Sequence, residues 1–129
     1  MTQEELKKRT KAFALRIIRL VEALPRTTVG RAIGAQVIRA GTSVGANYRA
    51  ACRARSKAEF SAKIGTVVEE ADETAFWLEL LAEARIVPET RLAPLLTEAN
   101  ELTAIFVASR KTASLLPIIN RQSSIGDTL

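Results

Sequence analysis

The sequence contains no histidine, and its 129 residues include one cysteine and only 5% aromatic residues. A chain without histidine cannot form a Ser-His-Asp or Cys-His nucleophile pair, a histidine-ligated zinc site or an imidazole acid–base catalyst. The lone Cys52 can form neither an internal disulfide nor a cysteine metal cluster, which is typical of a cytoplasmic protein. Six glycines and four prolines are too few for a turn-rich β architecture. We therefore expect no cofactor and no metal.

Long apolar runs are missing as well. The longest runs span a few residues, whereas a transmembrane helix needs about 20. The charged residues 1–11 do not resemble the start of a secretion signal. We therefore expect no membrane role. With 47% hydrophobic residues in 14.1 kDa, the chain can still bury the core of one domain.

Apolar residues recur at intervals of three and four through most of the chain, which is the spacing of amphipathic helices. Pro25 predicts that the first helix ends at Leu24 or just before, because the residue preceding a proline avoids the helical region. Thr27 or Thr28 is a suitable N-cap for the second helix, since its hydroxyl can accept a hydrogen bond from a free amide of the first turn.

Ser56 and Glu59 have the spacing of a capping box at the start of a third helix. Pro88 opens a fourth helix, where its missing N–H costs nothing, and Pro117 ends it. Four helices with such short connections predict an all-α fold, an antiparallel up-down-up-down four-helix bundle. We expect one domain over residues 1–116 and a loosely held C-terminal tail over residues 117–129.

Four of the six glycines fall on one face of the second helix. Each glycine inside a helix costs about 1 kcal/mol relative to alanine, so a compensating interaction is expected. Small residues four apart allow another helix to approach closely, and the alternative is a weak helix tolerated by its neighbours. The residues predicted to form this close helix packing are Gly30, Gly34, Gly41 and Gly45.

The net charge of +5 is unevenly distributed. Residues 27–57 contain six basic and no acidic residues, whereas residues 58–90 contain two basic and eight acidic ones. In an antiparallel hairpin, Arg39 would lie level with Asp72 and Glu73, and Arg31 with Glu79. We therefore predict ion pairs between these helices, either within one chain or between neighbouring subunits, worth about 0–1 kcal/mol each.

The basic residues that this pairing leaves unopposed form a positive surface on the first helix and at the turn before the third. Such a surface could contact nucleic-acid phosphates, and the alternative is an ordinary solvated helix face. No aromatic residues are interspersed, so base stacking is not indicated. The candidate nucleic-acid surface comprises Lys7, Lys8, Arg9, Lys11, Arg16, Arg19, Arg53, Arg55 and Lys57.

No catalytic constellation is apparent. The pairs Glu69/Asp72 and Glu70/Glu73 have i, i+3 spacing, but the di-iron bundles that use such positions also need histidine. Salt bridging is the favoured role of these carboxylates. Neighbouring arginines could lower the pKa of Cys52, yet without a base or a second cysteine a packing role is favoured. We therefore predict that the protein is not an enzyme.

A second apolar surface is predicted on the third helix. Phe76 and Leu80 point roughly 160° away from the core residue Leu78, on a wheel of about 100° per residue. With Trp77 they form a candidate oligomer interface, because a helix that is apolar on both sides is buried on both sides. The alternative is a set of scattered exposed apolar residues.

The central block of the chain resembles a known family. The carrying segments are Gly41-Thr-Ser-Val-Gly-Ala-Asn-Tyr-Arg-Ala-Ala and the stretch Val-Val-Glu-Glu-Ala-Asp-Glu-Thr-Ala-Phe-Trp-Leu-Glu-Leu-Leu from Val67, with Arg53, Arg55, Ser56, Glu59, Phe60 and Lys63 between them. They resemble the bacterial four helix bundle protein family, also called 23S rRNA intervening-sequence proteins. The similarity covers nearly the whole chain.

The resemblance implies a protein without enzymatic activity. Some members of the family are encoded inside intervening sequences of large-subunit rRNA genes. A related bundle, the accessory variability protein of diversity-generating retroelements, forms a basic pentameric barrel that associates with a reverse transcriptase and nucleic acid. By this resemblance, the chain is expected to form a homo-oligomer, with a pentamer as the expected state. RNA, DNA or a nucleic-acid enzyme is the other expected partner. The alternative is a protein–protein interaction scaffold with no nucleic-acid role.

Overall fold

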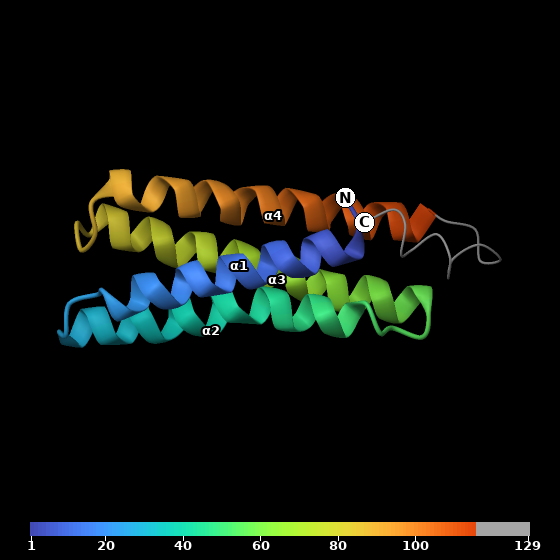
Figure 1. Cartoon of the computed structure of the whole chain (residues 1–129), viewed down its shortest axis with the longest axis horizontal. Coiled ribbons are helices and arrows are strands. Elements are labelled where there is room, and N and C mark those ends of the chain that lie inside the picture. Colours follow the sequence, from blue (N-terminus) through green and yellow to red (C-terminus); the bar gives the residue numbers. More distant parts are fainter. Residues whose placement is uncertain (116–129) are drawn as a thin grey trace.

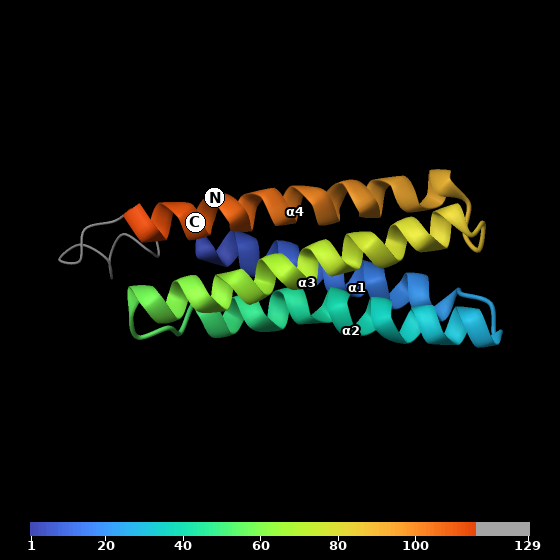
Figure 2. The same ribbon diagram turned by 180° about the vertical axis from the view of Figure 1, so that it is seen from behind.

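The computed structural model describes residues 1–115, which form an all-α four-helix bundle without strands (Figure 1). The helices are α1 (Gln3–Glu22), α2 (Thr28–Ala51), α3 (Lys57–Glu83) and α4 (Glu89–Leu115). Each runs antiparallel to the next in the chain, and the view from behind shows the same up-down-up-down order (Figure 2). The predicted fold class is confirmed, whereas the tail predicted over residues 117–129 lies outside the described residues.

The helix starts follow the sequence signals. The Thr27 hydroxyl accepts a hydrogen bond from the amide of Gly30 at 3.0 Å, and the Ser56 hydroxyl accepts one from the amide of Glu59 at 3.0 Å. The carboxylate of Glu59 accepts from the backbone amide of Arg55 at 3.2 Å, which completes the cap of α3. Both N-caps thus satisfy amides that the helix itself leaves free.

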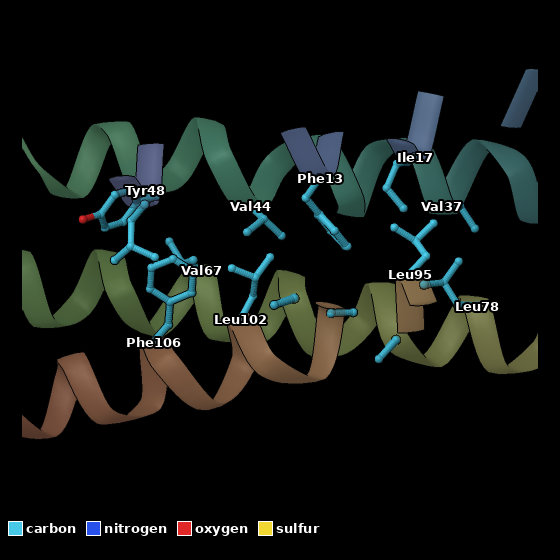
Figure 3. Packing of buried hydrophobic residues seen from close by; sticks show 14 of the residues in the cluster. Phe13, Ile17, Val37, Val44, Tyr48, Val67, Leu78, Leu95, Leu102 and Phe106 are labelled. Carbon is cyan, nitrogen blue, oxygen red and sulfur yellow. The ribbon is translucent and has the colours of Figure 1, made fainter. Parts of the chain in front are cut away.

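The core is a continuous column of apolar side chains from all four helices (Figure 3). Phe13 and Ile17 of α1 are almost completely buried, as are the residues that continue the predicted 3–4 spacing on α3 and α4. At one end of the column the rings of Tyr48 and Phe106 pack together, with centroids 5.1 Å apart. The periodicity of the sequence therefore identifies the buried face of each helix.

The first helix is attached unequally to its two neighbours. It packs along α2, whereas its backbone comes close to that of α4 at few positions. There Arg9 links the two helices, donating hydrogen bonds of 2.7 Å to each carboxylate oxygen of Glu98 and one of 2.8 Å to Glu101. Hydrogen bonding to Glu98 raises the pKa of Arg9 above its ordinary value. Arg9 therefore belongs to an interhelical clamp.

Candidate nucleic-acid interface

The fold gathers basic residues at one end of the bundle. The antiparallel order brings the start of α1, the α2–α3 connection and the end of α4 together (Figure 1). We call residues 1–11, 45–66 and 104–115 the basic end. It contains three acidic residues, Glu4, Glu5 and Glu59, and eleven basic ones: Lys7, Lys8, Arg9, Lys11, Arg49, Arg53, Arg55, Lys57, Lys63, Arg110 and Lys111.

Most of the predicted nucleic-acid surface lies at this end, but the structure changes its extent. Arg16 and Arg19 are further along α1, away from the cluster. The cluster also contains four basic residues that are not predicted from the sequence to belong to this surface: Arg49, Lys63, Arg110 and Lys111. Arg110 comes from the end of α4 and donates a hydrogen bond to the Ser61 hydroxyl of α3 at 3.3 Å. Only the packing of α4 on α3 could reveal that neighbour.

The α2–α3 connection has a shallow hollow of its own. Arg53, Arg55 and Lys63 line it together with Ala50 and Glu59, and its volume is about 520 Å³. The Glu59 carboxylate is engaged in capping α3. The hollow therefore has three basic side chains around one acid that is already hydrogen-bonded.

The predicted ion pairs between α2 and α3 form only in part. Arg39 donates to Glu70 at 3.3 Å and also contacts Glu73, so it binds two carboxylates one turn apart on α3. Asp72 is the wrong partner, because it lies between those two positions and faces solvent. Among residues 1–115, Arg39 is the only α2 side chain in an ion pair with α3.

The predicted pair between Arg31 and Glu79 is also wrong. Arg31 lines a hollow on the α1 side of α2, beside Val21 and Pro25, and so faces away from α3. The acidic residues of α3 begin at Glu69 apart from the capping Glu59, which places them away from Arg49, Arg53 and Arg55. On α3, Glu59 alone opposes the positive charge at the end of α2.

The glycine face of α2 packs partly against α1 and partly against the turn between α1 and α2. A Cβ on Gly41 would lie 2.7 Å from Ile17 Cγ1, and one on Gly45 would lie 3.2 Å from Thr10 Oγ1. Gly34 likewise faces Leu24 at 3.2 Å. Gly30 differs, because a Cβ there would clash with the carbonyl oxygen of Pro25 in the preceding turn. Helix packing thus explains three glycines, and the α1–α2 turn explains Gly30.

Phe76 is the main exposed aromatic side chain on α3, with 51% of its surface accessible. It packs edge-on against Trp77, with ring centroids 5.1 Å apart. The indole Nε1 of Trp77 donates to Glu73 at 3.1 Å, which connects this aromatic pair to the Arg39 ion pair. Leu80, one turn further on, is half-buried. The three residues form an accessible apolar surface beside the α2–α3 contact.

Other candidate chemistry is not supported within residues 1–115. Burial raises the pKa of the Cys52 thiol, and this effect outweighs the lowering by Tyr48, Lys7 and Arg53. The neighbouring arginines therefore do not activate the thiol. The Tyr48 hydroxyl beside it is buried without a hydrogen-bond partner, and burial raises its pKa too.

Within residues 1–115, no group of three or more His, Cys, Asp and Glu could hold a metal ion. No described helix is long and apolar enough to cross a membrane.

Comparisons with known proteins agree with this architecture. The family model described as 23S rRNA-intervening sequence protein matches residues 3–108. Among solved structures, a protein of unknown function from the S23 ribosomal protein family of Bacteroides thetaiotaomicron is similar, with 31% sequence identity and a TM-score of 0.80. The similarity covers 86% of this chain and 99% of that one. No curated protein matches the chain.

Proposed function

The chain belongs to the 23S rRNA-intervening sequence protein family, and we propose that it is a non-enzymatic oligomeric bundle whose basic end binds structured nucleic acid, RNA in the first place. It would act as an accessory module of a ribonucleoprotein rather than as a catalyst. The proposal places the protein in the cytoplasm, which suits its single free cysteine.

The concentration of charge at the basic end carries this proposal. The basic end contains eleven basic residues and three acidic ones, and of the basic ones Arg9 is already paired with Glu98 and Glu101 of α4. A phosphate backbone that binds such a surface releases its condensed counterions, which makes the interaction favourable and dependent on salt. The carboxylates of Glu70 and Glu73, the best candidates for acid–base chemistry, are both bound by Arg39. That pairing supports a structural role for them and a protein that is not an enzyme.

We expect the full chain to bind a structured RNA hairpin more weakly as salt rises. If about five phosphates are contacted, affinity should fall roughly 10²- to 10³-fold between 50 and 200 mM salt. Fluorescence anisotropy at both concentrations measures this, with a DNA duplex of the same sequence for comparison.

A double variant at the opposite end, Arg26→Glu with Arg91→Glu, provides the control and should retain most of the affinity. Absence of binding at 50 mM salt, or an affinity that does not change with salt, would contradict the nucleic-acid role.

The proposal includes self-assembly through the surface formed by Phe76, Trp77 and Leu80, in a ring of five subunits. An aromatic pair on α3, in which Phe76 is exposed and Trp77 is partly buried, supports it, since Phe and Trp are enriched in the centres of protein interfaces. Phe76→Glu should lower the particle mass measured by light scattering, because a buried unpaired carboxylate disfavours the contact. Val29→Glu is the matched control, because Val29 is 54% exposed and lies at the start of α2. An unchanged mass for Phe76→Glu refutes this interface.

The same aromatic surface favours one other candidate function, a protein-interaction scaffold with no nucleic-acid role. The two are separated by what co-purifies with the native protein. An absorbance ratio that indicates nucleic acid supports the accessory-module proposal, whereas a stoichiometric protein partner without nucleic acid supports the scaffold.

A further inference from the structure

A groove about 500 Å³ in volume runs between α1 and α2 at the basic end. We call it the α1–α2 groove. It is lined by Glu4, Lys7, Lys8, Thr10, Lys11 and Ala14 of α1 and by Thr42, Gly45, Ala46 and Arg49 of α2. Four of these ten residues are basic and one is acidic. The groove is distinct from the hollow at the α2–α3 connection, since the two share no lining residue.

The floor of the groove is built from small residues. Gly45 brings the two backbones so close that an added Cβ would lie 3.2 Å from Thr10 Oγ1, and Ala14 and Ala46 add only methyl groups. The hydroxyls of Thr10 and Thr42 donate back to their own helices, to Leu6 at 2.8 Å and Ile38 at 2.6 Å. Both hydroxyl protons are therefore already in hydrogen bonds within the protein. The floor carries no charge, and no large side chain fills the groove.

The rim of the groove is positively charged and largely unneutralised. Lys8, Lys11 and Arg49 are exposed, and within residues 1–115 none of the three takes part in an ion pair. Lys7 does pair with Glu4, at 3.2 Å, and this uses the only acidic residue of the groove. Cations that face a hollow with low-dielectric walls repel one another and concentrate the field there, which attracts a multiply charged anion.

A second hollow between α1 and α2 shows whether close packing of these helices is enough to produce a basic groove. It lies at the opposite end and has the same kind of small-residue floor, with Gly30, Gly34 and Ala35. Its charged residues are Glu22, Arg26 and Arg31, and apolar side chains occupy much of the remaining wall. Close helix packing alone therefore does not produce a basic groove. The cluster of cations is particular to the basic end.

We propose that the α1–α2 groove binds a run of consecutive phosphates, with Lys8, Lys11 and Arg49 as the contacting cations. Lys8 and Lys11 lie about one helical turn apart, roughly 5 Å along α1, so they can serve neighbouring phosphates from one wall while Arg49 closes the other. The expected source is the backbone of the RNA, and in this respect the inference rests on the proposed function. Free polyphosphate has the same chemistry and is the other source to test.

The first experiment compares double charge reversals in the full chain. Lys8→Glu with Lys11→Glu should weaken binding of the RNA hairpin at least tenfold and reduce the salt slope by about 2, because two phosphate contacts are lost. The reversal Arg26→Glu with Arg31→Glu, in the second hollow between α1 and α2, should change affinity less than threefold. Lys8→Arg with Lys11→Arg keeps the charge and should bind like the wild type, and circular dichroism checks that all variants fold.

A comparison within the basic end sharpens this result. Arg53→Glu with Arg55→Glu changes net charge by the same amount at the α2–α3 connection. Equal losses for this pair and for the groove pair would mean that only the overall charge of the end matters, which would overturn the groove assignment.

The second experiment observes the groove directly. Titration with tripolyphosphate and, separately, with the RNA hairpin should shift the backbone amide resonances of Gly45 and Ala46 and leave those of Gly34 and Ala35 in place. RNA binding without shifts at Gly45 and Ala46 would overturn the groove and leave the proposed function intact. Tripolyphosphate shifts without RNA binding would support the groove with free polyphosphate as its ligand and would contradict the proposed function. No response to either ligand overturns both.

Discussion

Gly41→Leu is expected to destabilise the bundle by about 3 kcal/mol, the upper range for overpacking a tight core position. The first added atom would already lie 2.7 and 2.9 Å from two carbons of the Ile17 side chain. Ile17 is fully buried, and its β-branched side chain has little rotamer freedom in a helix. The clash can therefore be relieved only by moving α1 away from α2. Urea denaturation followed by circular dichroism measures the loss.

Two further variants make this result specific. Gly65→Ala on α3 is the control, because its nearest neighbour is the flexible guanidinium end of Arg110, at 3.0 Å. It should be neutral or stabilise by up to about 1 kcal/mol through helix propensity. In an Ile17→Ala background the added leucine gains space, so Gly41→Leu should cost much less there. An equal cost in both backgrounds would show that Ile17 is not the cause.

The Gly41 contact also matters for the proposed nucleic-acid surface. Ile17 and the three lysines of the α1–α2 groove belong to α1, and Gly41 lies one turn from Gly45 in the groove floor. A displacement of α1 would widen the groove. Any Gly41→Leu protein that still folds should therefore bind RNA more weakly than its charge alone implies.

Arg9→Met should destabilise the protein by about 2 kcal/mol, since hydrogen bonds to charged groups contribute about 1.5–3 kcal/mol. The Arg9 and Glu98 side chains are 25% and 16% exposed, so the loss leaves a mostly buried carboxylate without its partner. Methionine retains the apolar stem, so the change tests the charge rather than the packing. Thermal unfolding measures the effect, and Lys8→Met, at an exposed position without an ion pair, should change stability by less than about 0.5 kcal/mol.

The effect of Arg9→Met should also be local to α1. Because α1 approaches α4 closely at few other positions, hydrogen exchange should accelerate in α1 before it does in α3 or α4. Adding Glu98→Gln to Arg9→Met should recover part of the stability by removing the unpaired charge. Uniform acceleration of exchange across all helices, with no recovery from Glu98→Gln, would show that the ion pair does not hold α1 in place.

The partners of the charged side chains were the feature least well predicted from the sequence. Counted by segment, the six basic residues of 27–57 are predicted to face the acids of 58–90. In the bundle only Arg39 makes such a contact, because ion pairing depends on which face of each helix a side chain occupies. Arg9 shows the same limit. It was assigned to the nucleic-acid surface, but its partners are Glu98 and Glu101, about 90 residues away in the chain.

By itself, the sequence determined the features that arise from local chemistry. The four helices, their caps at Thr27 and Ser56 and the buried face of each follow from prolines, short polar side chains and a 3.6-residue period. Only the tertiary structure decided how distant segments share space. In the structure, Lys8 and Lys11 of α1 lie across a floor of small residues from Arg49 of α2, and Arg110 of α4 lies at the same basic end. The physical reason is that each helix determines its own faces, whereas the charge of a surface depends on the register and rotation of several helices together.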